Sequence, residues 1–160
     1  MNDDRYPSLR ASPLCRELDD EQCRRLATLT ELRDLAAGEV LVREGTRDPH
    51  LYLIVHGALG VVRNAGTEEA VSLNALTAGD LVDELGFVDD TPYYASKVAL
   101  APTRVVSLER GRFESLLERE PHIVYRVMRA IVRVTHDAQR RLALQQNELA
   151  NYIYKQHGRY

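Results

Sequence analysis

Glycines placed at intervals divide the middle of the chain into short apolar segments. Gly38, Gly45, Gly57 and Gly79 bound stretches such as 51–56, which are rich in aliphatic and β-branched residues. Runs of this length, separated by turn residues, are typical of β-strands. Glycine is favoured at tight turns because it tolerates a positive φ. The spacing therefore predicts a rolled-up β domain built from short strands.

The positions of the strands follow from the apolar runs. We expect strands at residues 40–43, 51–56, 59–63, 70–76 and 98–108. His56 and Gly57 are predicted to form a hairpin turn, and the polar residues 64–69 a second one. Many short strands joined by turns favour a jelly roll or a small barrel over a parallel sheet.

Helical patterns precede the β region. Residues 1–12 are mostly polar, so we expect a flexible arm there. Apolar residues recur at near-helical spacing over 13–31, which predicts one or two short helices. Asp19 followed by Gln22 has the pattern of an N-cap with its capping-box partner.

A long helix is predicted after the β region. A short helix is expected over 112–119, and Pro121 is then well placed in the first turn of the next helix. No proline or glycine occurs from 122 to about 156, and apolar residues recur every three or four positions. Such a narrow apolar stripe indicates pairing with another helix. The predicted organisation is an arm at 1–12, a β domain with its leading helices at 13–120, and a dimerisation helix at 121–160.

The chain contains two cysteines, Cys15 and Cys23. A spacing of eight residues places them about two turns apart, too far along one helix for a disulfide. We interpret both as small core residues. Unpaired thiols are typical of a reducing cytoplasm, which is the location that we expect.

Composition and motifs argue against several functions. The 24 acidic and 21 basic residues give a formal net charge of −3, which provides no overall attraction to nucleic acid or to an anionic membrane. No apolar run reaches the roughly 18 residues that a bilayer span requires. Neither a Gly-x-Ser-x-Gly nor a Gly-Lys-Ser/Thr motif occurs, the histidines are scattered, and two cysteines are too few for an iron–sulfur cluster. We therefore expect neither an enzyme nor a metal site.

The chain resembles the cyclic nucleotide-binding domains of catabolite-activator and Fnr-like regulators. The resemblance runs from about Ser12 to the C-terminal helix, and rests on the glycine frame, the leading and trailing helices, and the segments 92–96 and 99–103. It implies a mainly β fold with flanking helices, in which a double-stranded β-helix, or jelly-roll-like barrel, is followed by a long dimer helix.

The resemblance also places a phosphate-binding cassette after Gly79. In the family this cassette reads Gly-Glu-Leu and, several residues later, Pro-Arg-Ser-Ala; glutamate accepts from the ribose 2′-hydroxyl and arginine neutralises the cyclic phosphate. Here the glutamate is retained, aspartate replaces the glycine, and tyrosines replace the arginine and the serine. A one-residue shift of the alignment recovers no cation either. The candidate ligand-binding residues of this degenerate cassette are Asp83, Glu84, Leu85, Gly86, Tyr93, Tyr94, Ala95 and Ser96.

Loss of the arginine predicts weak or absent binding of cAMP and cGMP. One charge-assisted contact contributes about 1.5–3 kcal/mol, and Asp83 adds repulsion. No cofactor is therefore expected, with a cyclic nucleotide as the disfavoured possibility. Lys97 is interpreted as an exposed or bulged strand residue rather than a replacement phosphate ligand. Tyr93 and Tyr94 have two interpretations: they fill the vacated pocket, which we favour, or they stack on a different ligand.

These observations favour a stand-alone regulatory or sensor domain with an altered pocket, which signals through protein contacts. We expect a homodimer through the C-terminal helix and an unidentified protein partner, with no DNA binding by this chain alone and no membrane insertion. The chain ends about one helix after the β region, so a further helix-turn-helix module is not expected. Two alternatives are a ligand-free dimeric adaptor, and the effector half of a transcription regulator that lacks its helix-turn-helix.

Overall fold

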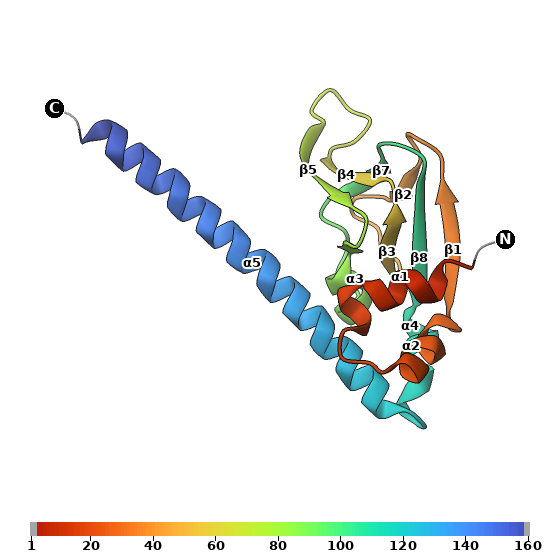
Figure 1. Ribbon diagram of the computed structural model, residues 1–160. Helices are drawn as coiled ribbons and strands as arrows, with labels where there is room; N and C mark the ends of the chain where they lie inside the picture. The colour runs from red at the N-terminus through yellow and green to blue at the C-terminus, as the bar shows by residue number, and fades with distance from the viewer. Residues whose placement is uncertain (1–2, 159–160) are drawn as a thin grey trace.

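Two four-stranded antiparallel sheets form a β-roll, with a group of short helices at one end and one long helix that extends away from it (Figure 1). The computed structural model describes residues 3–158. The first sheet has the order β1 (Thr30–Leu35), β8 (Thr103–Glu109), β3 (His50–His56) and β6 (Leu81–Val82). The second has the order β2 (Val40–Val42), β7 (Ser96–Ala99), β4 (Ala58–Arg63) and β5 (Val71–Thr77). The jelly-roll prediction is confirmed as two sheets, although these do not close into a barrel.

Gly57 joins the two sheets rather than the two arms of a hairpin. Strand β3 pairs with β6 and β8, whereas β4 pairs with β5 and β7. The predicted hairpin at His56-Gly57 is therefore wrong. Gly57 has a φ of +92°, and a side chain there would begin 2.7 Å from the carbonyl oxygen of Pro102. Only glycine fits this corner, because the backbone of the 101–103 turn approaches it so closely.

The other predicted strands are present with shifted bounds. The expected hairpin over 64–69 connects β4 to β5. The single strand expected at 98–108 is instead β7 and β8, separated by a bend at 100–102. Strands β1 and β6 were not among the predicted segments.

The N-terminal segment is ordered as helix, which corrects the predicted flexible arm. Helix α1 (Arg5–Ala11) buries Leu9, and the short 3₁₀ helix η1 (Pro13–Cys15) and helix α2 (Asp20–Ala27) follow. The capping box of α2 is confirmed, since Asp19 accepts from the Gln22 backbone N–H and the Gln22 side chain accepts from that of Asp19.

The two cysteines lie side by side, which corrects the separation expected for one continuous helix. Cys15 ends η1 and Cys23 lies in α2, and the turn between these helices brings their Sγ atoms to 2.8 Å. Both thiols are buried, as predicted.

The core has two parts. One lies between the sheets and includes Leu59, Val82, Tyr93 and Val105. The other joins the outer side of the first sheet to the N-terminal helices and the start of the long helix, and includes Leu14, Cys15, Cys23, Phe87, Phe113 and Val127. The two buried clusters explain why the β-roll, the N-terminal helices and the base of the long helix form one unit.

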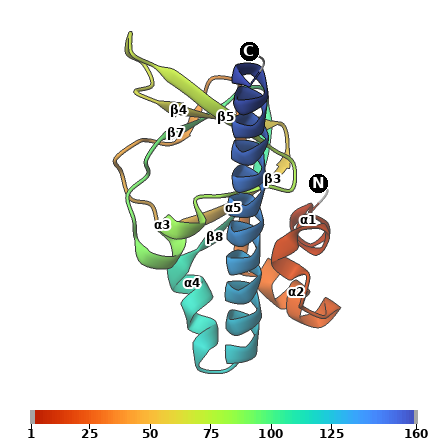
Figure 2. The same cartoon turned by 90° about the vertical axis from the view of Figure 1, so that its left-hand side faces the viewer.

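Helix α5 (Pro121–His157) begins at the predicted proline, after α4 (Arg110–Glu114) and η2 (Ser115–Leu117). Its first turns pass between α4 and the N-terminal helices (Figure 2) and bury Ile123, Val124, Val127, Ala130 and Ile131. Beyond that point the helix extends away from the β-roll (Figure 1). None of the helices within residues 3–158 is both long and apolar enough to cross a membrane.

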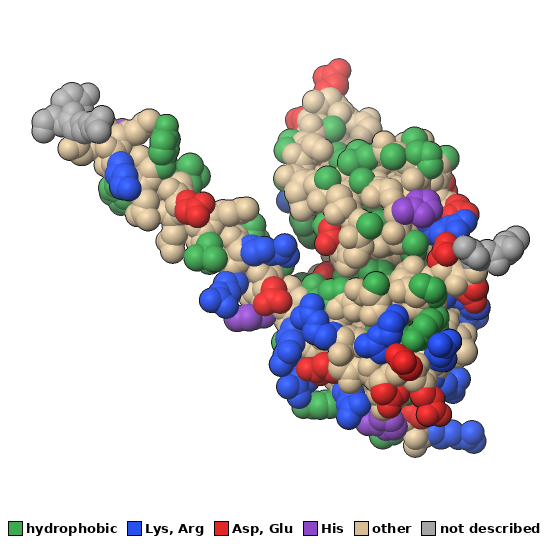
Figure 3. Space-filling model, viewed as in Figure 1, with side chains coloured by type: hydrophobic (Ala, Val, Ile, Leu, Met, Phe, Trp, Pro, Cys, Tyr) green, Lys and Arg blue, Asp and Glu red, His purple; other side chains and the backbone are tan. Residues whose placement is uncertain are grey.

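Basic side chains gather near the base of α5 (Figure 3). The guanidinium groups of Arg129 and Arg133 lie 3.3 and 3.6 Å from the Glu17 carboxylate. Arg126 donates to the Glu17 carbonyl oxygen. These arginines therefore attach α5 to the N-terminal helices rather than forming only a solvated face.

Candidate functional site

The site is built around the segment that leaves β6, forms α3 (Glu84–Asp89) and returns as β7. Asp83 connects β6 to α3 with φ 62° and ψ 50°, the left-handed region. Non-glycine residues adopt this region uncommonly, and aspartate is among those that tolerate it. The backbone at position 83 thus keeps the conformation that glycine favours, while the residue adds a carboxylate.

That carboxylate forms a buried ion pair with Lys97. The Lys97 ammonium nitrogen lies 2.7 Å from Asp83 Oδ1, and the two side chains are only 3% and 8% exposed. Lys97 also donates to the Ala95 carbonyl oxygen at 3.4 Å. The expectation of an exposed strand lysine is wrong. Lys97 does lie opposite the register shift in β2, where it pairs with Val42.

The two cassette tyrosines have different positions. Tyr93 is 4% exposed and its hydroxyl donates to the Asp48 carbonyl oxygen at 3.4 Å, so its ring fills the interior. Tyr94 is 58% exposed, with its ring centroid 4.9 Å from the Lys97 ammonium nitrogen. This distance is within the range of a cation–π contact. Tyr93 therefore fills the interior, whereas Tyr94 is open to solvent and fills no pocket.

Asp48 contacts this segment through the Tyr93 hydroxyl, and it was not identified from the sequence. Its Oδ2 atom accepts from the Tyr52 hydroxyl at 2.6 Å, and its Oδ1 atom contacts His50 Nδ1. Burial raises the pKa of both Tyr52 and Tyr93, and Asp48 adds to the effect, so both phenols stay neutral. The only sequence signal for Asp48 is its place just before a predicted strand.

The carboxylates of the site are poorly solvated. Burial raises the pKa of Asp83, against the opposing effect of Lys97. Burial also raises the pKa of Glu84, and the charge of Asp83 adds to it. Asp83 Oδ2 is buried and has no hydrogen-bond partner among the described residues. The site therefore places two poorly solvated carboxyl groups beside one buried cation, Lys97.

The remaining cassette residues are dispersed. Leu85 is 60% exposed, whereas Gly86 is buried against the Tyr93 ring. Ala95 is fully buried. The Ser96 hydroxyl accepts a hydrogen bond from the Glu44 backbone N–H at 3.0 Å, so it is directed toward the turn that follows β2.

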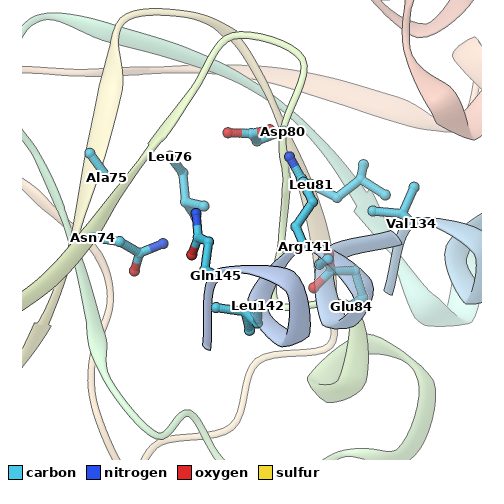
Figure 4. Close-up of a pocket in the computed structure, with 11 residues that line it drawn as sticks. Asn74, Ala75, Leu76, Asp80, Leu81, Glu84, Val134, Arg141, Leu142 and Gln145 are labelled. Atoms are coloured by element: carbon cyan, nitrogen blue, oxygen red, sulfur yellow. The ribbon is translucent and has the colours of Figure 1, made fainter. Parts of the chain in front are cut away.

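A cavity of about 330 Å³ separates the cassette from α5 (Figure 4). Of the eight predicted site residues, only Glu84 lines it. The full lining is Asn74, Ala75, Leu76, Asp80, Leu81, Glu84, Val134, Ala138, Arg141, Leu142 and Gln145. Figure 4 shows the Arg141 side chain directed from α5 toward Asp80. Among the described lining residues Arg141 is the one cation, and it was not among the predicted site residues.

The middle of the chain matches a known protein family. Residues 32–120 match the family model described as "Cyclic nucleotide-binding domain". This range runs from β1 to the residue before α5, and it contains every residue of the predicted cassette.

Individual relatives agree with this match. The cGMP-dependent protein kinase, isozyme 1, of Drosophila melanogaster is 30% identical over 112 residues, which cover 68% of this chain but only 15% of that kinase. The N-terminal domain of a transcriptional regulator from Streptomyces coelicolor is 27% identical with a TM-score of 0.70, covering 82% of this chain and 94% of that one. A cyclic nucleotide-binding domain from Methylobacillus flagellatus has a TM-score of 0.77 at 21% identity, covering 87% and 80%.

Proposed function

The chain belongs to the cyclic nucleotide-binding domain family, and on that premise we propose that it is a regulatory domain with an altered pocket, which binds cAMP and cGMP weakly or not at all and signals through protein contacts. The observation that carries the proposal is the buried ion pair between Lys97 and Asp83. Lys97, the buried cation beside the cassette, thus already has an anionic partner within the chain.

A cyclic phosphate would have to compete with Asp83 for Lys97. The carboxylate is held 2.7 Å from the ammonium group, in a place where both side chains are almost fully buried. A phosphate that displaced it would leave the carboxylate unpaired in a poorly solvated site, beside Glu84. A missing charge-assisted contact of about 1.5–3 kcal/mol alone lowers affinity by one to two decades.

The route from pocket to partner would run through α5. Val134, Arg141 and Gln145 of this helix face Leu81 and Glu84 across the cavity. A ligand in the cavity could move α5 only if it bound more tightly to the protein with the helix in one position than in the other. Beyond the base, α5 exposes large apolar side chains that a second copy could cover: Val132, Leu142, Leu144, Leu149, Tyr152, Ile153 and Tyr154. We place a homodimer contact there, and the dimer would signal to a further protein partner.

A ligand-free dimeric adaptor is the second candidate. It is favoured by Tyr93, whose buried ring occupies the interior behind the cassette. In that case the cavity beside Glu84 would stay empty in the working protein.

Thermal unfolding with cAMP or cGMP tests the altered pocket. The wild-type Tm should not change at about 1 mM nucleotide, whereas a ligand at ten times its Kd would raise it by several degrees. Asp83→Gly suits the left-handed backbone, frees Lys97 and should confer a nucleotide-dependent increase. Glu148→Gln, which removes one exposed acidic charge on the far part of α5, is the control.

Stabilisation of the wild-type protein by either nucleotide would refute the altered pocket. Arg141→Gln would then show whether Arg141 supplies the missing cation, with the neighbouring and exposed Arg140→Gln as its match. No response of Asp83→Gly, together with an inert wild type, would favour the ligand-free adaptor.

A further inference from the structure

The thiols of Cys15 and Cys23 form a close pair away from the cassette. Their Sγ atoms are 2.8 Å apart, and both side chains are fully buried. No feature of the proposed ligand pocket uses them. We infer that this pair is an oxidation site, at which a peroxide converts the two thiols into an intrachain disulfide that reductant reverses.

The chain around the pair is arranged to keep the thiols together. Arg10, from α1, donates to the Cys15 carbonyl oxygen at 2.9 Å and to the Leu18 carbonyl oxygen at 2.8 Å. These two bonds close the turn between η1 and α2, which is what brings Cys15 back beside Cys23. Arg10 is thus a positioning residue for the pair.

Arg10 also provides favourable electrostatics. Burial raises the pKa of both thiols, which slows their oxidation, because the thiolate is the reactive form. The Arg10 guanidinium acts in the opposite direction on both. The Sγ atoms are also close enough that a thiolate formed on one cysteine could accept a hydrogen bond from the thiol of the other.

The chemistry balances with one peroxide molecule. A thiolate attacks a peroxide oxygen, the O–O bond breaks, and the products are a sulfenic acid and hydroxide, which takes up the thiol proton as water. The second thiol then attacks the sulfenic sulfur, and its proton leaves with the hydroxyl group as a second water. Two thiols lose two electrons in total, and the peroxide gains them.

The position of the pair connects it to the long helix. Cys15 and Cys23 belong to the buried cluster that also contains Ile123, Val127 and Ile131 of α5. A disulfide would fix η1 against α2, and these helices cover the base of α5. Oxidation would therefore make η1 and α2, which cover the base of α5, more rigid. This inference does not depend on whether the cassette binds a nucleotide.

The test is oxidation of the folded full chain with hydrogen peroxide, followed by denaturation, alkylation with iodoacetamide and intact-mass measurement. We expect a species that takes up no alkyl group, is lighter than the reduced chain by two hydrogens, runs as a monomer without reductant, and regains two alkylation sites after dithiothreitol. Its Tm should exceed that of the reduced protein by a few degrees. Cys15→Ser and Cys23→Ser should each fail to give it.

Arg10→Gln tests whether the two thiols react because Arg10 positions them or only because they lie close together. If Arg10 holds the turn, this variant should oxidise several-fold more slowly at neutral pH, while Arg16→Gln, which changes an exposed arginine of the same segment, should not. Chain-to-chain disulfides, or a disulfide that forms only after unfolding in urea, would overturn the inference. The inference would also be overturned if both thiols still took up iodoacetamide in full after peroxide treatment of the native protein.

Discussion

The ammonium group of Lys97 and the carboxylate of Asp83 are 2.7 Å apart, and neither side chain is more than 8% exposed. One group comes from β7 and the other from the end of β6, so the contact ties the return strand to the entry of the cassette. The pair is also incomplete, because Asp83 Oδ2 has no partner among the described residues. Removal of either member should therefore leave the other buried without an opposite charge.

Lys97→Met should destabilise the protein strongly. It leaves the Asp83 carboxylate buried without its cation, and loss of one member of a buried pair costs about 3–5 kcal/mol. The double variant Lys97→Met/Asp83→Asn buries no net charge and should recover part of this loss. Urea unfolding measures both. If Lys97→Met costs less than about 1 kcal/mol, the pair behaves as a solvent-exposed one.

The cassette tyrosines should respond unequally to truncation. Tyr93→Ala removes a buried ring from the core between the sheets, and aromatic-to-alanine changes in cores cost about 3–5 kcal/mol. Tyr94→Ala changes an exposed side chain and should stay within about 0.5 kcal/mol. Equilibrium unfolding by urea distinguishes them. Equal losses would contradict the division into one filling ring and one open ring.

The sequence predicted the architecture better than the site. Pro121 and the Asp19–Gln22 capping box were recognised because they determine local backbone geometry. Gly57 was recognised as a turn, but its hairpin was wrong because the strands on either side pair in different sheets. The division of 98–108 into β7 and β8 was missed, since Leu100–Pro102 continues an apolar run and the bend depends on tertiary contacts. The N-terminal helix was missed because its single buried anchor, Leu9, gives no periodic signal.

The candidate site residues came only from the family pattern. Asp83, Glu84 and Tyr93 were chosen through the cassette spacing, and their role in binding stays a prediction. Lys97 was placed at the surface because a strand lysine is usually exposed, and nothing nearby in the sequence shows that Asp83 would fold over it. Arg141 was not singled out, because its place beside the cavity depends on how α5 faces β5 and β6, a relationship that residue spacing alone does not contain.

Stability should fall as pH rises above the ordinary range of a glutamate. Burial raises the pKa of Glu84, so the folded state holds this proton to higher pH than the unfolded state, whose carboxyl titrates near its usual value of about 4.3. Between the two values the folded state binds more protons, and the free energy of unfolding must therefore decrease with rising pH. Asp83 contributes in the same direction, because burial raises its pKa too.

Glu84→Gln tests this dependence. Urea unfolding from pH 4 upward should show a smaller decrease in stability for this variant than for the wild type, and a still smaller one for Glu84→Gln/Asp83→Asn. Glu148→Gln, an exposed site on α5, should leave the slope unchanged. A slope that is the same with and without Glu84 would mean that its carboxyl is solvated in the folded protein.

Self-association should depend on the far part of α5. Leu142 and Leu149 are 60% and 61% exposed and lie seven residues apart, two turns along one face of the helix. If a second copy covers this face, Leu142→Asp/Leu149→Asp should convert a dimer into a monomer, because each change places a charge against an apolar surface. The fold itself should be retained, since neither side chain belongs to the buried core. Light scattering after size exclusion measures the mass, and circular dichroism checks the helix.

Two further variants make the result specific. Glu148→Gln lies beside Leu149 on the same helix and should leave the dimer intact, because it adds no charge. Tyr125→Asp changes a residue that is 65% exposed in the first turns of α5, outside the far part of the helix, and should also leave the dimer intact. A wild-type protein that is monomeric at about 100 μM, a concentration at which even micromolar dimers assemble, would contradict a homodimer through α5. The exposed apolar face would then have to meet a different protein, and the partner contact would move from a second copy to that protein.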